Sequence, residues 1–473
     1  MGARRFTGRI FALLACIAVG CEEAPRPIAP VAESGELVVL TVNGPSTYFE
    51  DAEDQPSGLE YDLVTMFAKE LGAKARFVLV QNPATIDTIL RKGQAHLAAA
   101  ALPKHFDFPG GLAWGPSYLS TQHEVVCRDE TKAKKLDELT GKRIGVIEET
   151  VADYLLTEPS KLKVPIERFD PETSTADLLE KVAHGSLDCA LVESTRFTLA
   201  RRYFPSLEPA FNVGKPLEYA WLVSPVDKKR ILAAAGPFFE RIRRDGTLKR
   251  LIDRYYSHAA HLSAIDATAL LEQVATQLDK LKPHFVEAES ATGIDWRLIA
   301  AIGYQESHWD PNATSPTGVR GLMMLTEDTA DQLQVKDRLD VRDSIVAGAR
   351  YLAMIKEQLP PRIAEPDRTF LALAAYNIGI GQLEDARILA QRSGLSPDKW
   401  QDVRQVISRL ADPATYPSLK HGYARGGEAM QLVDNVRNYY DIISRMRPRD
   451  GPPAPGELAP EAQASSKDSA PSR

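Results

Sequence analysis

Two hydrophobic patterns divide this chain. Over residues 36–258, short β-branched runs alternate with segments in which apolar residues recur at helical spacing. Strands are predicted at residues 37–42, 76–80, 141–148 and 188–192, and a helix is predicted at residues 59–71, ahead of Gly72. This alternation indicates an α/β fold with largely parallel strands.

After residue 258 the strand pattern stops. Ala/Leu-rich segments with helical spacing predict helices at residues 267–291, 296–307, 327–334, 344–358, 368–378, 382–391, 401–410 and 427–445. Residues 259–447 should therefore form an all-α domain. Because 473 residues are too many for one ordinary hydrophobic core, a multidomain protein is expected, with the α/β domain first and the all-α domain second.

The two ends of the chain carry a different pattern. Residues 1–20 combine a basic start with the apolar run Ile10–Val19, which is typical of a secretory signal peptide. That run has about half of the ~20 residues that a membrane-spanning helix needs. Residues 21–35 are rich in Pro and Ala and predict a flexible tether, and residues 448–473 predict a disordered tail.

Cys21 follows the apolar run in the sequence Ala18-Val19-Gly20-Cys21. This sequence resembles the lipobox at which bacterial lipoproteins are cleaved and acylated. The alternative is a plain secretory signal with an incidental cysteine, but we favour the lipoprotein because a tether follows directly. The acyl chains would hold the protein on the periplasmic side of a membrane, for which we expect the outer membrane.

Composition narrows the possible partners. The formal net charge is −7 and Lys and Arg are spread through the chain, which argues against nucleic acid as a partner. No His, Cys and carboxylate cluster has metal-ligand spacing, and no Gly-rich phosphate loop precedes a helix, so neither a metal nor a cofactor is predicted. Cys127 and Cys189 would be able to pair in an oxidising compartment, but the favoured interpretation is two small buried hydrophobic residues.

Glu306 stands near the end of a predicted helix. Asp295 is a suitable N-cap, and an apolar stripe that includes Ile299 and Ile302 leads to Glu306. A carboxyl group on such a face loses hydration, which raises its pKa and lets it hold the proton that a general acid needs. On this helix alone, a Glu that simply reaches solvent is the better interpretation.

Three later motifs change that interpretation. They are Gly318-Val319-Arg320-Gly321-Leu322-Met323-Met324-Leu325-Thr326, then Ala374-Ala375-Tyr376-Asn377-Ile378-Gly379, and then Tyr423-Ala424-Arg425-Gly426-Gly427-Glu428-Ala429 ahead of Asn435-Val436-Arg437-Asn438-Tyr439-Tyr440. Together with Glu306-Ser307 they resemble the soluble-lytic-transglycosylase domain, and matches in this order are specific. The resemblance implies an all-α, goose-lysozyme-like fold that cleaves the glycan strands of peptidoglycan.

The resemblance also implies roles for single residues. Glu306 would be the catalytic acid and base, and Ser307 would orient the substrate or the carboxylate. Gly321 would permit a tight turn beside the cleft. Met323 and Met324 would line the saccharide groove, although many family members carry Gln in place of Met324, which removes a polar contact.

Tyr376 and Asn377, at a helix end capped by Gly379, would contact the sugar or hold Glu306. Glu428 would lie near the groove, and helix capping accounts for it equally well. Ordinary glycoside hydrolases use two carboxylates, whereas the resemblance implies one. Glu306 would protonate the linkage between N-acetylmuramic acid and N-acetylglucosamine and then deprotonate the 6-hydroxyl, which gives a 1,6-anhydro end without consuming water.

Residues 36–258 resemble the family-3 periplasmic solute-binding proteins, in which two lobes close on a small ligand. The resemblance rests on the order of Gly58-Leu59-Glu60-Tyr61-Asp62-Leu63, Gly115-Pro116-Ser117-Tyr118, Gly141-Lys142-Arg143-Ile144-Gly145-Val146 and Gly185-Ser186-Leu187-Asp188-Cys189-Ala190. Joined to the later motifs, it is similar to the membrane-bound lytic murein transglycosylase F family over nearly the whole mature chain. It implies a two-lobed, ligand-sensing regulatory domain.

Two positions depart from the amino-acid-binding pattern of that family. Lys104 stands where a guanidinium would clamp an α-carboxylate, and Lys binds only as a point charge. Glu193 stands where an Asp usually meets the α-amino group. We therefore expect a muropeptide or wall peptide as the ligand, or an empty scaffold. Tyr48, Trp114 and Tyr118 are candidates for lining the cleft, although such aromatic residues more often belong to the core.

Two other functions stay open at this stage. A binding or sensor lipoprotein would hold glycan in its helical domain without cleaving it, and Glu306 would then have no catalytic role. A muramidase that uses water would need a second carboxylate, for which Asp310 or Glu327 would have to serve.

Overall fold

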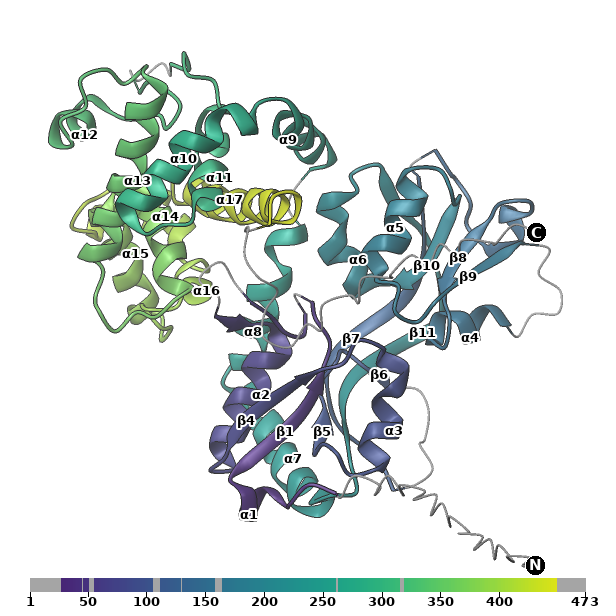
Figure 1. Ribbon diagram of the computed structural model, residues 1–473. Coiled ribbons are helices and arrows are strands. Elements are labelled where there is room, and N and C mark those ends of the chain that lie inside the picture. Colours follow the sequence, from purple (N-terminus) through teal and green to yellow (C-terminus); the bar gives the residue numbers. More distant parts are fainter. Residues whose placement is uncertain are drawn as a thin grey trace, which may run out of the picture.

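The computed structural model describes residues 27–448, except residues 45, 51–54, 105–110, 129, 158–163, 261–262 and 315–318. The predicted signal peptide, the acylation site Cys21 and the predicted tail from residue 449 onward lie outside the described residues. Figure 1 shows an α/β part built around one sheet and a helical part beside it. None of the helices in the described ranges is long and apolar enough to cross a bilayer.

Nine described strands form one mixed sheet in the α/β part, in the order β4-β1-β5-β11-β7-β10-β8-β9, with β6 pairing β11. At one end, β1 (Glu36–Thr41) is parallel to β4 (Lys74–Leu79) and β5 (Leu97–Ala98). At the other end, β8 (Ile144–Ile147) is parallel to β9 (Ile166–Phe169) and β10 (Cys189–Glu193). The remaining strands are β7 (Ala113–Arg128), β11 (Leu207–Val223) and β6 (Pro103–Lys104), and a separate small sheet pairs β2 (Phe49–Glu50) with β3 (Pro56–Ser57).

The long antiparallel strands β7 and β11 join the two ends of the sheet. Strand β10 pairs with the later half of β7, whereas β5 and β6 pair with the later half of β11, and the register between β7 and β11 shifts between Val213 and Leu217. The strands therefore cross from one lobe to the other, and the predicted two-lobed α/β fold is confirmed. The expectation of largely parallel strands holds only at the two ends, because these crossing strands pair antiparallel and were missed.

Each lobe has its own hydrophobic core. In the first lobe, Phe67, Trp221 and Phe239 are fully buried between the sheet and the helices. In the second lobe, Leu178 and Leu187 are buried in the same way. The helices are α1 (Val31–Ser34), α2 (Leu59–Glu70), α3 (Ile86–Arg91), α7 (Lys228–Arg244) and α8 (Thr247–Tyr256) in the first lobe, and α4 (Val151–Thr157), α5 (Thr175–Ala183) and α6 (Ser194–Ala200) in the second.

Part of the predicted tether is packed against the first lobe. Residues 27–35 include α1, Val31 is only 1% exposed, and the backbone N–H of Ile28 donates to the carbonyl of Gly93 over 2.8 Å. These contacts make residues 27–35 part of the lobe, which the Pro/Ala-rich composition did not indicate. The tether is therefore proposed only for residues 21–26, which lie outside the described residues.

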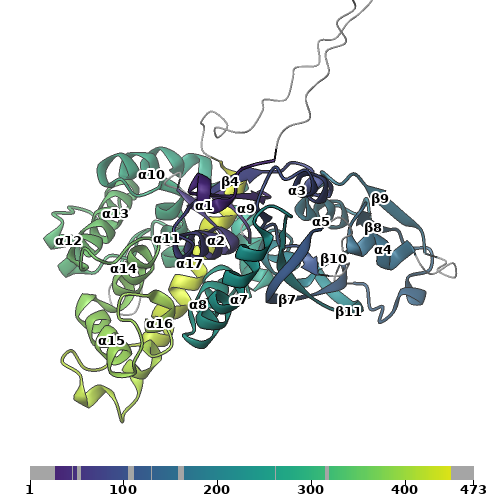
Figure 2. The same ribbon diagram turned by 90° about the horizontal axis from the view of Figure 1, so that it is seen from below.

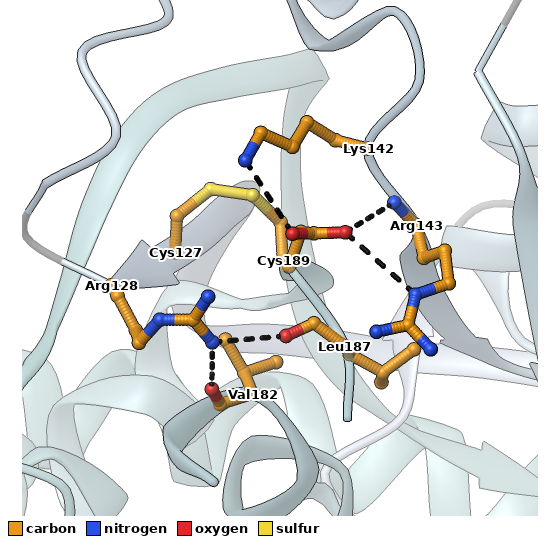
Figure 3. Close-up of a disulfide and its surroundings, with 8 residues drawn as sticks. Cys127, Arg128, Lys142, Arg143, Val182, Leu187 and Cys189 are labelled. Atoms are coloured by element: carbon orange, nitrogen blue, oxygen red, sulfur yellow. Dashed lines mark hydrogen bonds and ion pairs between the residues drawn. A yellow bond between two sulfur atoms is a disulfide. The ribbon is translucent and has the colours of Figure 1, made fainter. Parts of the chain in front are cut away.

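A disulfide joins Cys127 of β7 to Cys189 of β10, where the two residues face each other in antiparallel register. Both are fully buried, as the favoured interpretation had it, and they are also paired, which the sequence left open because spacing does not reveal strand register. Figure 3 shows the bond close to the side chain of Lys142, which forms an ion pair with Asp188 over 3.5 Å. The disulfide therefore links the crossing strand to the second lobe.

The helical part has one core, formed by residues from nearly all of its helices. The helices are α9 (Ala264–Thr276), α10 (Leu278–Thr292), α11 (Trp296–Ser307), α12 (Glu327–Gln332), α13 (Val341–Gln358), α14 (Asp367–Ile378), α15 (Ile380–Arg392), α16 (Trp400–Val403) and α17 (Gly426–Met446). Short 3-10 helices lie at Pro83–Thr85, Leu136–Leu139, Arg201–Tyr203, His258–Ala260, Ile407–Ala411 and Tyr416–Ser418.

The all-α prediction is confirmed in the described residues after 263, with two differences in detail. The predicted helix at 267–291 is two helices, because the backbone of Gln277 leaves the helical region. The predicted helix at 401–410 is the single turn α16 followed by a 3-10 helix. We keep 36–258 and 259–447 as the proposed domain bounds.

The disulfide yields a first prediction. Replacing both Cys127 and Cys189 by Ser should lower the free energy of unfolding of the α/β domain by about 2–4 kcal/mol, because the cross-link restricts the unfolded chain. Denaturant unfolding measures this change. Lys142→Ala removes only the neighbouring exposed ion pair and should cost less than about 1 kcal/mol. Equal stability of the double Ser variant and the oxidised protein would contradict the prediction.

Candidate active site

Helix α11 positions Glu306 through its own capping and packing. The Oδ1 of Asp295 accepts the N–H of Arg297 over 2.8 Å at the N-cap, as predicted. Ile299 and Ile302 are buried in the helical core. The helix ends at His308, whose backbone is left-handed, so Glu306 lies in the last turn. The N-cap and the left-handed residue thus set the two ends of α11, and its buried face determines the direction in which the Glu306 side chain leaves the helix.

A cavity of about 280 Å³ opens beside Glu306. It is lined by Gln305 and Glu306 from α11, by Asn377 from the end of α14, and by Glu428, Gln431, Leu432 and Asn435 from α17. The lining is almost entirely polar, yet the two carboxyl groups differ. Glu428 is well exposed and pairs with Arg425 over 3.3 Å, whereas Glu306 faces the cavity from a partly buried helix end.

Burial gives Glu306 the property of an acid. Loss of hydration raises the pKa of its carboxyl group to about 8 from the ordinary value of 4.5. The carboxyl therefore carries a proton at neutral pH. A protonated carboxyl at a polar cavity is able to donate that proton to a bound ether oxygen and later accept another.

The chain after α11 folds into a tight turn that supports Glu306 from behind. Gly321 has a φ of +82°, and a Cβ there would lie 1.8 Å from the carbonyl oxygen of Arg338, so only Gly fits. The Oγ of Ser307 donates to the carbonyl of Leu322 over 2.8 Å. The turn and the end of α11 are therefore held together by the residue next to Glu306.

Met323 and Tyr376 complete this support. Met323 is fully buried and packs against Gly348, so it lies behind the cavity and not along a groove as the resemblance implied. The hydroxyl of Tyr376 donates to the carbonyl of Met323 over 3.2 Å. Burial, and then the charge of Glu306, raise the pKa of Tyr376 well above its ordinary range, so the phenol stays neutral beside the acid.

The structure thus brings the predicted residues together in two layers. Glu306, Asn377 and Glu428 line the cavity, while Ser307, Gly321, Met323 and Tyr376 hold the turn behind it. Met324 is partly buried with a φ of 47° at the tip of the turn.

Sequence reasoning missed Gln305, Gln431, Leu432 and Asn435. The α17 residues follow Glu428 at spacings of three, four and seven, so a helical projection of the predicted helix would have found them. Asp310 and Glu327, the carboxylates considered for a hydrolase, are exposed and do not line this cavity.

In the α/β domain, Glu193 belongs to a polar cluster where the strands cross. It accepts the Nε of Arg196 over 2.5 Å and the hydroxyl of Tyr219 over 2.7 Å. Nearby, Tyr118 is 6% exposed and donates to the buried carboxyl of Glu60. Glu60 also accepts the backbone N–H of Ala101 over 2.8 Å, and burial raises its pKa to about 7.

The other cleft candidates are not in this cluster. Tyr48 packs against Tyr61 and Phe77. Trp114 packs against a different hydrophobic cluster of the first lobe, and Lys104 is exposed on β6. The sequence could not separate these residues because it does not show which part of the lobe, or which face of a strand, each one occupies. Within the described residues, no three His, Cys, Asp or Glu side chains are grouped as metal ligands.

The raised pKa of Glu306 predicts a pH-dependent stability difference. Because the folded pKa of about 8 exceeds the unfolded value of 4.5, the stability that this group contributes is complete below about pH 4.5 and is lost as the pH rises through 8. Glu306→Gln is always neutral and has no such loss. Its melting temperature relative to that of the unchanged protein should rise by several degrees between about pH 5 and about pH 9.

Thermal unfolding at both pH values measures this difference, with Glu327→Gln as the control because that side chain is exposed. A difference for Glu306→Gln that stays constant with pH would show that Glu306 is already ionised at neutral pH.

Comparison with known proteins agrees with both parts of this structure. Residues 37–258 match the profile of bacterial extracellular solute-binding proteins, family 3, and residues 283–396 match that of the transglycosylase SLT domain. A relative from Nitrosospira multiformis, named membrane-bound lytic murein transglycosylase F, is 46% identical over 94% of this chain and 93% of its own length. Relatives of the same name from Methylobacillus flagellatus and Thiobacillus denitrificans are 43% and 39% identical, over 93% and 95% of this chain and 94% and 98% of their own lengths. At this identity and coverage, the chain belongs to the membrane-bound lytic murein transglycosylase F family.

Proposed function

We propose that this protein is a peptidoglycan lytic transglycosylase whose reaction is carried by Glu306 and whose α/β domain senses a ligand. The observation that carries the proposal is a single desolvated carboxyl group at a polar cavity, in a chain that matches lytic murein transglycosylases over nearly its full length. A sensor that only binds glycan would not need such a carboxyl. A water-using muramidase would need a second carboxylate in the role that Asp310 or Glu327 was considered for, and neither lines the cavity.

The reaction begins with Glu306 as the acid. Its proton moves to the oxygen that links N-acetylmuramic acid to N-acetylglucosamine, and the bond from that oxygen to the anomeric carbon breaks. The substrate's own acetamido group stabilises the positive charge at that carbon. Glu306, now a carboxylate, takes the proton of the 6-hydroxyl, whose oxygen closes the 1,6-anhydro ring. The proton balance is zero and Glu306 ends protonated, ready for another cycle.

The surrounding residues divide into substrate contacts and support. Asn377 and Glu428 line the cavity and are the proposed glycan contacts. Met324, at the tip of the neighbouring turn, is proposed to add an apolar rather than a polar contact. Ser307, Gly321, Met323 and Tyr376 keep the last turn of α11 fixed against the following turn. This support matters because a general acid must stay within hydrogen-bonding distance of the bond that breaks.

Product analysis tests the proposal. Purified protein incubated with peptidoglycan should release fragments with 1,6-anhydro ends, each 18 mass units below the hydrolysis product because water is not added. Glu306→Gln should lower the rate by at least about 1000-fold, since it cannot donate a proton. Glu327→Gln serves as the control and should keep its activity. Reducing ends would show a hydrolase, and unchanged activity of Glu306→Gln would remove the catalytic assignment.

For the cell envelope, we propose that Cys21 is acylated and anchors the chain on the periplasmic side of the outer membrane. The relatives are named membrane-bound, and Cys21 follows the lipobox-like sequence. The partners are then glycan strands within reach of that surface.

The proposed ligand of the α/β domain is a muropeptide or wall peptide. The polar cluster of Glu193, Arg196 and Tyr219 supplies both an acidic and a basic group at the crossing of the lobes, which suits a zwitterionic peptide. Tyr118, which donates to Glu60 and whose ring lies 6.4 Å from that of Tyr219, remains a proposed contact beside this cluster. Tyr48, Trp114 and Lys104 remain proposed contacts only for a different lobe arrangement, because their present neighbours lie elsewhere.

Ion pairs connect this domain to the catalytic cavity. Figure 2 shows α8 between the helical part and the sheet. The guanidinium of Arg254 on α8 pairs with Asp62 of the first lobe over 3.3 Å and with Asp367 over 3.0 Å. Asp367 is buried at the start of α14, the helix that ends with Tyr376 and Asn377 at the active site.

A second contact joins the other lobe to α17. Arg202 pairs with Asp441 over 2.9 Å, and His258 at the domain junction also contacts Asp441 over 3.1 Å. The same α17 lines the cavity through Glu428 and Asn435. The lobes are therefore tied to α14 and α17, two helices of the active site, so a change in the angle between the lobes would be transmitted to the cavity.

Arg254 provides the test of this route. With stem peptides released from peptidoglycan as the probe, turnover should change by at least about twofold in the unchanged protein, and Arg254→Ala should reduce that response to less than half. The control Lys249→Ala removes an exposed pair with Asp253 on the same helix and should keep the response. A full response in Arg254→Ala would exclude this route, and no response to any stem peptide would contradict ligand sensing itself.

A further inference from the structure

One face of α17 is polar where it borders the cavity. Glu428, Gln431 and Asn435 are spaced by three and four residues, so they share a face, and all three line the cavity beside Glu306. The opposite face carries Val433 and Val436, which are fully buried in the helical core. The polar face is therefore not required for packing the helix.

Two side-chain amides lie on this face, those of Gln431, which is exposed, and of Asn435. Among the described residues, no side-chain hydrogen bond is made by Gln431 or Asn435, and Asn435 is half-buried. Asn438, one turn further along α17, contrasts with them. Its amide donates to the carbonyl of His258 over 2.8 Å, and its oxygen faces Arg202 over 3.5 Å. Both amides are accessible from the cavity, so their donors and acceptors are open to a ligand that enters it.

The cavity presents two further amides, those of Gln305 and Asn377, around the carboxyl of Glu306. A side-chain amide has a carbonyl that accepts and an NH₂ that donates, which is the complement of an acetamido group. N-acetylated sugars carry that group on the carbon next to the anomeric carbon. An amide wall facing a general acid therefore suits a substrate whose acetamido group lies close to the bond being broken.

For the reaction to proceed, the residues of this wall have to orient the acetamido group of the substrate. The acetamido carbonyl must point at the anomeric carbon to stabilise its charge, so a protein group has to hold the N–H on the other side. Glu428 is paired with Arg425 and well exposed. Asn435 is nearer the helix core and its Oδ1 is able to accept that N–H.

We propose that Asn435, assisted by Gln431, binds the acetamido group of the sugar on which Glu306 acts and turns its carbonyl toward the anomeric carbon. This inference rests on the proposed function, because it names the substrate group that the same cavity recognises. Asn435 is then a substrate-positioning residue, and Gln431 supports the same group from one turn earlier on α17. Recognition of the acetamido group is thereby separate from the acid chemistry of Glu306.

A binding cycle tests this assignment without cleavage. In a Glu306→Gln background, the affinity for soluble glycan strands is measured with N-acetylated strands and with chemically de-N-acetylated strands. Asn435→Ala should weaken binding of the N-acetylated strands by about tenfold, the effect of one lost hydrogen bond to a desolvated group. It should not weaken binding of the de-N-acetylated strands, which lack the group. Equal weakening for both strands would overturn the proposal.

Kinetics with Glu306 intact gives a second readout. Asn435→Ala should lower kcat more than it raises KM, because orientation matters most in the transition state. Asn435→Asp keeps an acceptor for the N–H and should recover part of the lost kcat, which a purely structural role of Asn435 would not produce. Gln391→Ala, an exposed position on α15, is the control. An Asn435→Asp variant no faster than Asn435→Ala would count against the assignment.

These outcomes separate the two proposals. If the unchanged protein releases no anhydro products, the proposed function fails, whatever the binding cycle shows. If it releases them and Asn435→Ala weakens the binding of N-acetylated and de-N-acetylated strands equally, only the assignment of Asn435 fails. Melting temperatures of all variants, measured alongside, show that each is folded.

Discussion

The loss of hydration at the carboxyl group of Glu306 is the constraint on which the rest of the structure depends. It raises the pKa to about 8, so that the group holds a proton at neutral pH, and this proton starts the proposed reaction. The state is kept by packing on one side and by a polar wall on the other. Ser307 and Tyr376 fix the turn behind Glu306, while neutral amides and a Glu428 already paired with Arg425 face it.

The same helices that surround Glu306 also reach the α/β domain. α14 begins at Asp367, which Arg254 ties to the first lobe, and α17 carries Asp441, which Arg202 ties to the second. Separating a buried ion pair leaves an uncompensated charge, which costs free energy. Movement of one lobe therefore favours movement of the helix to which it is paired. This arrangement gives a ligand-sensing domain a physical connection to the acid, with no additional element between them.

The sequence predicted the order of the domains and the end of α11, because helical spacing and the N-cap Asp295 are local signals. It also predicted Glu306, Asn377 and Glu428 at one site, through the resemblance. It left the disulfide open and missed the crossing strands, since both depend on register between segments far apart in the chain. It placed Met323 in the groove, whereas the fold buries this side chain against Gly348, and it did not single out Asn435, which lines the cavity.

The most direct test of the account is a titration of the Glu306 carboxyl group itself. Infrared difference spectra of the protein against its Glu306→Gln variant isolate the carbonyl band of the protonated acid as the pH is raised. We expect this band to be present at neutral pH and to disappear with a midpoint at about pH 8. A midpoint near the ordinary value of 4.5 would show an ionised carboxylate at neutral pH and would contradict the assignment of Glu306 as the acid.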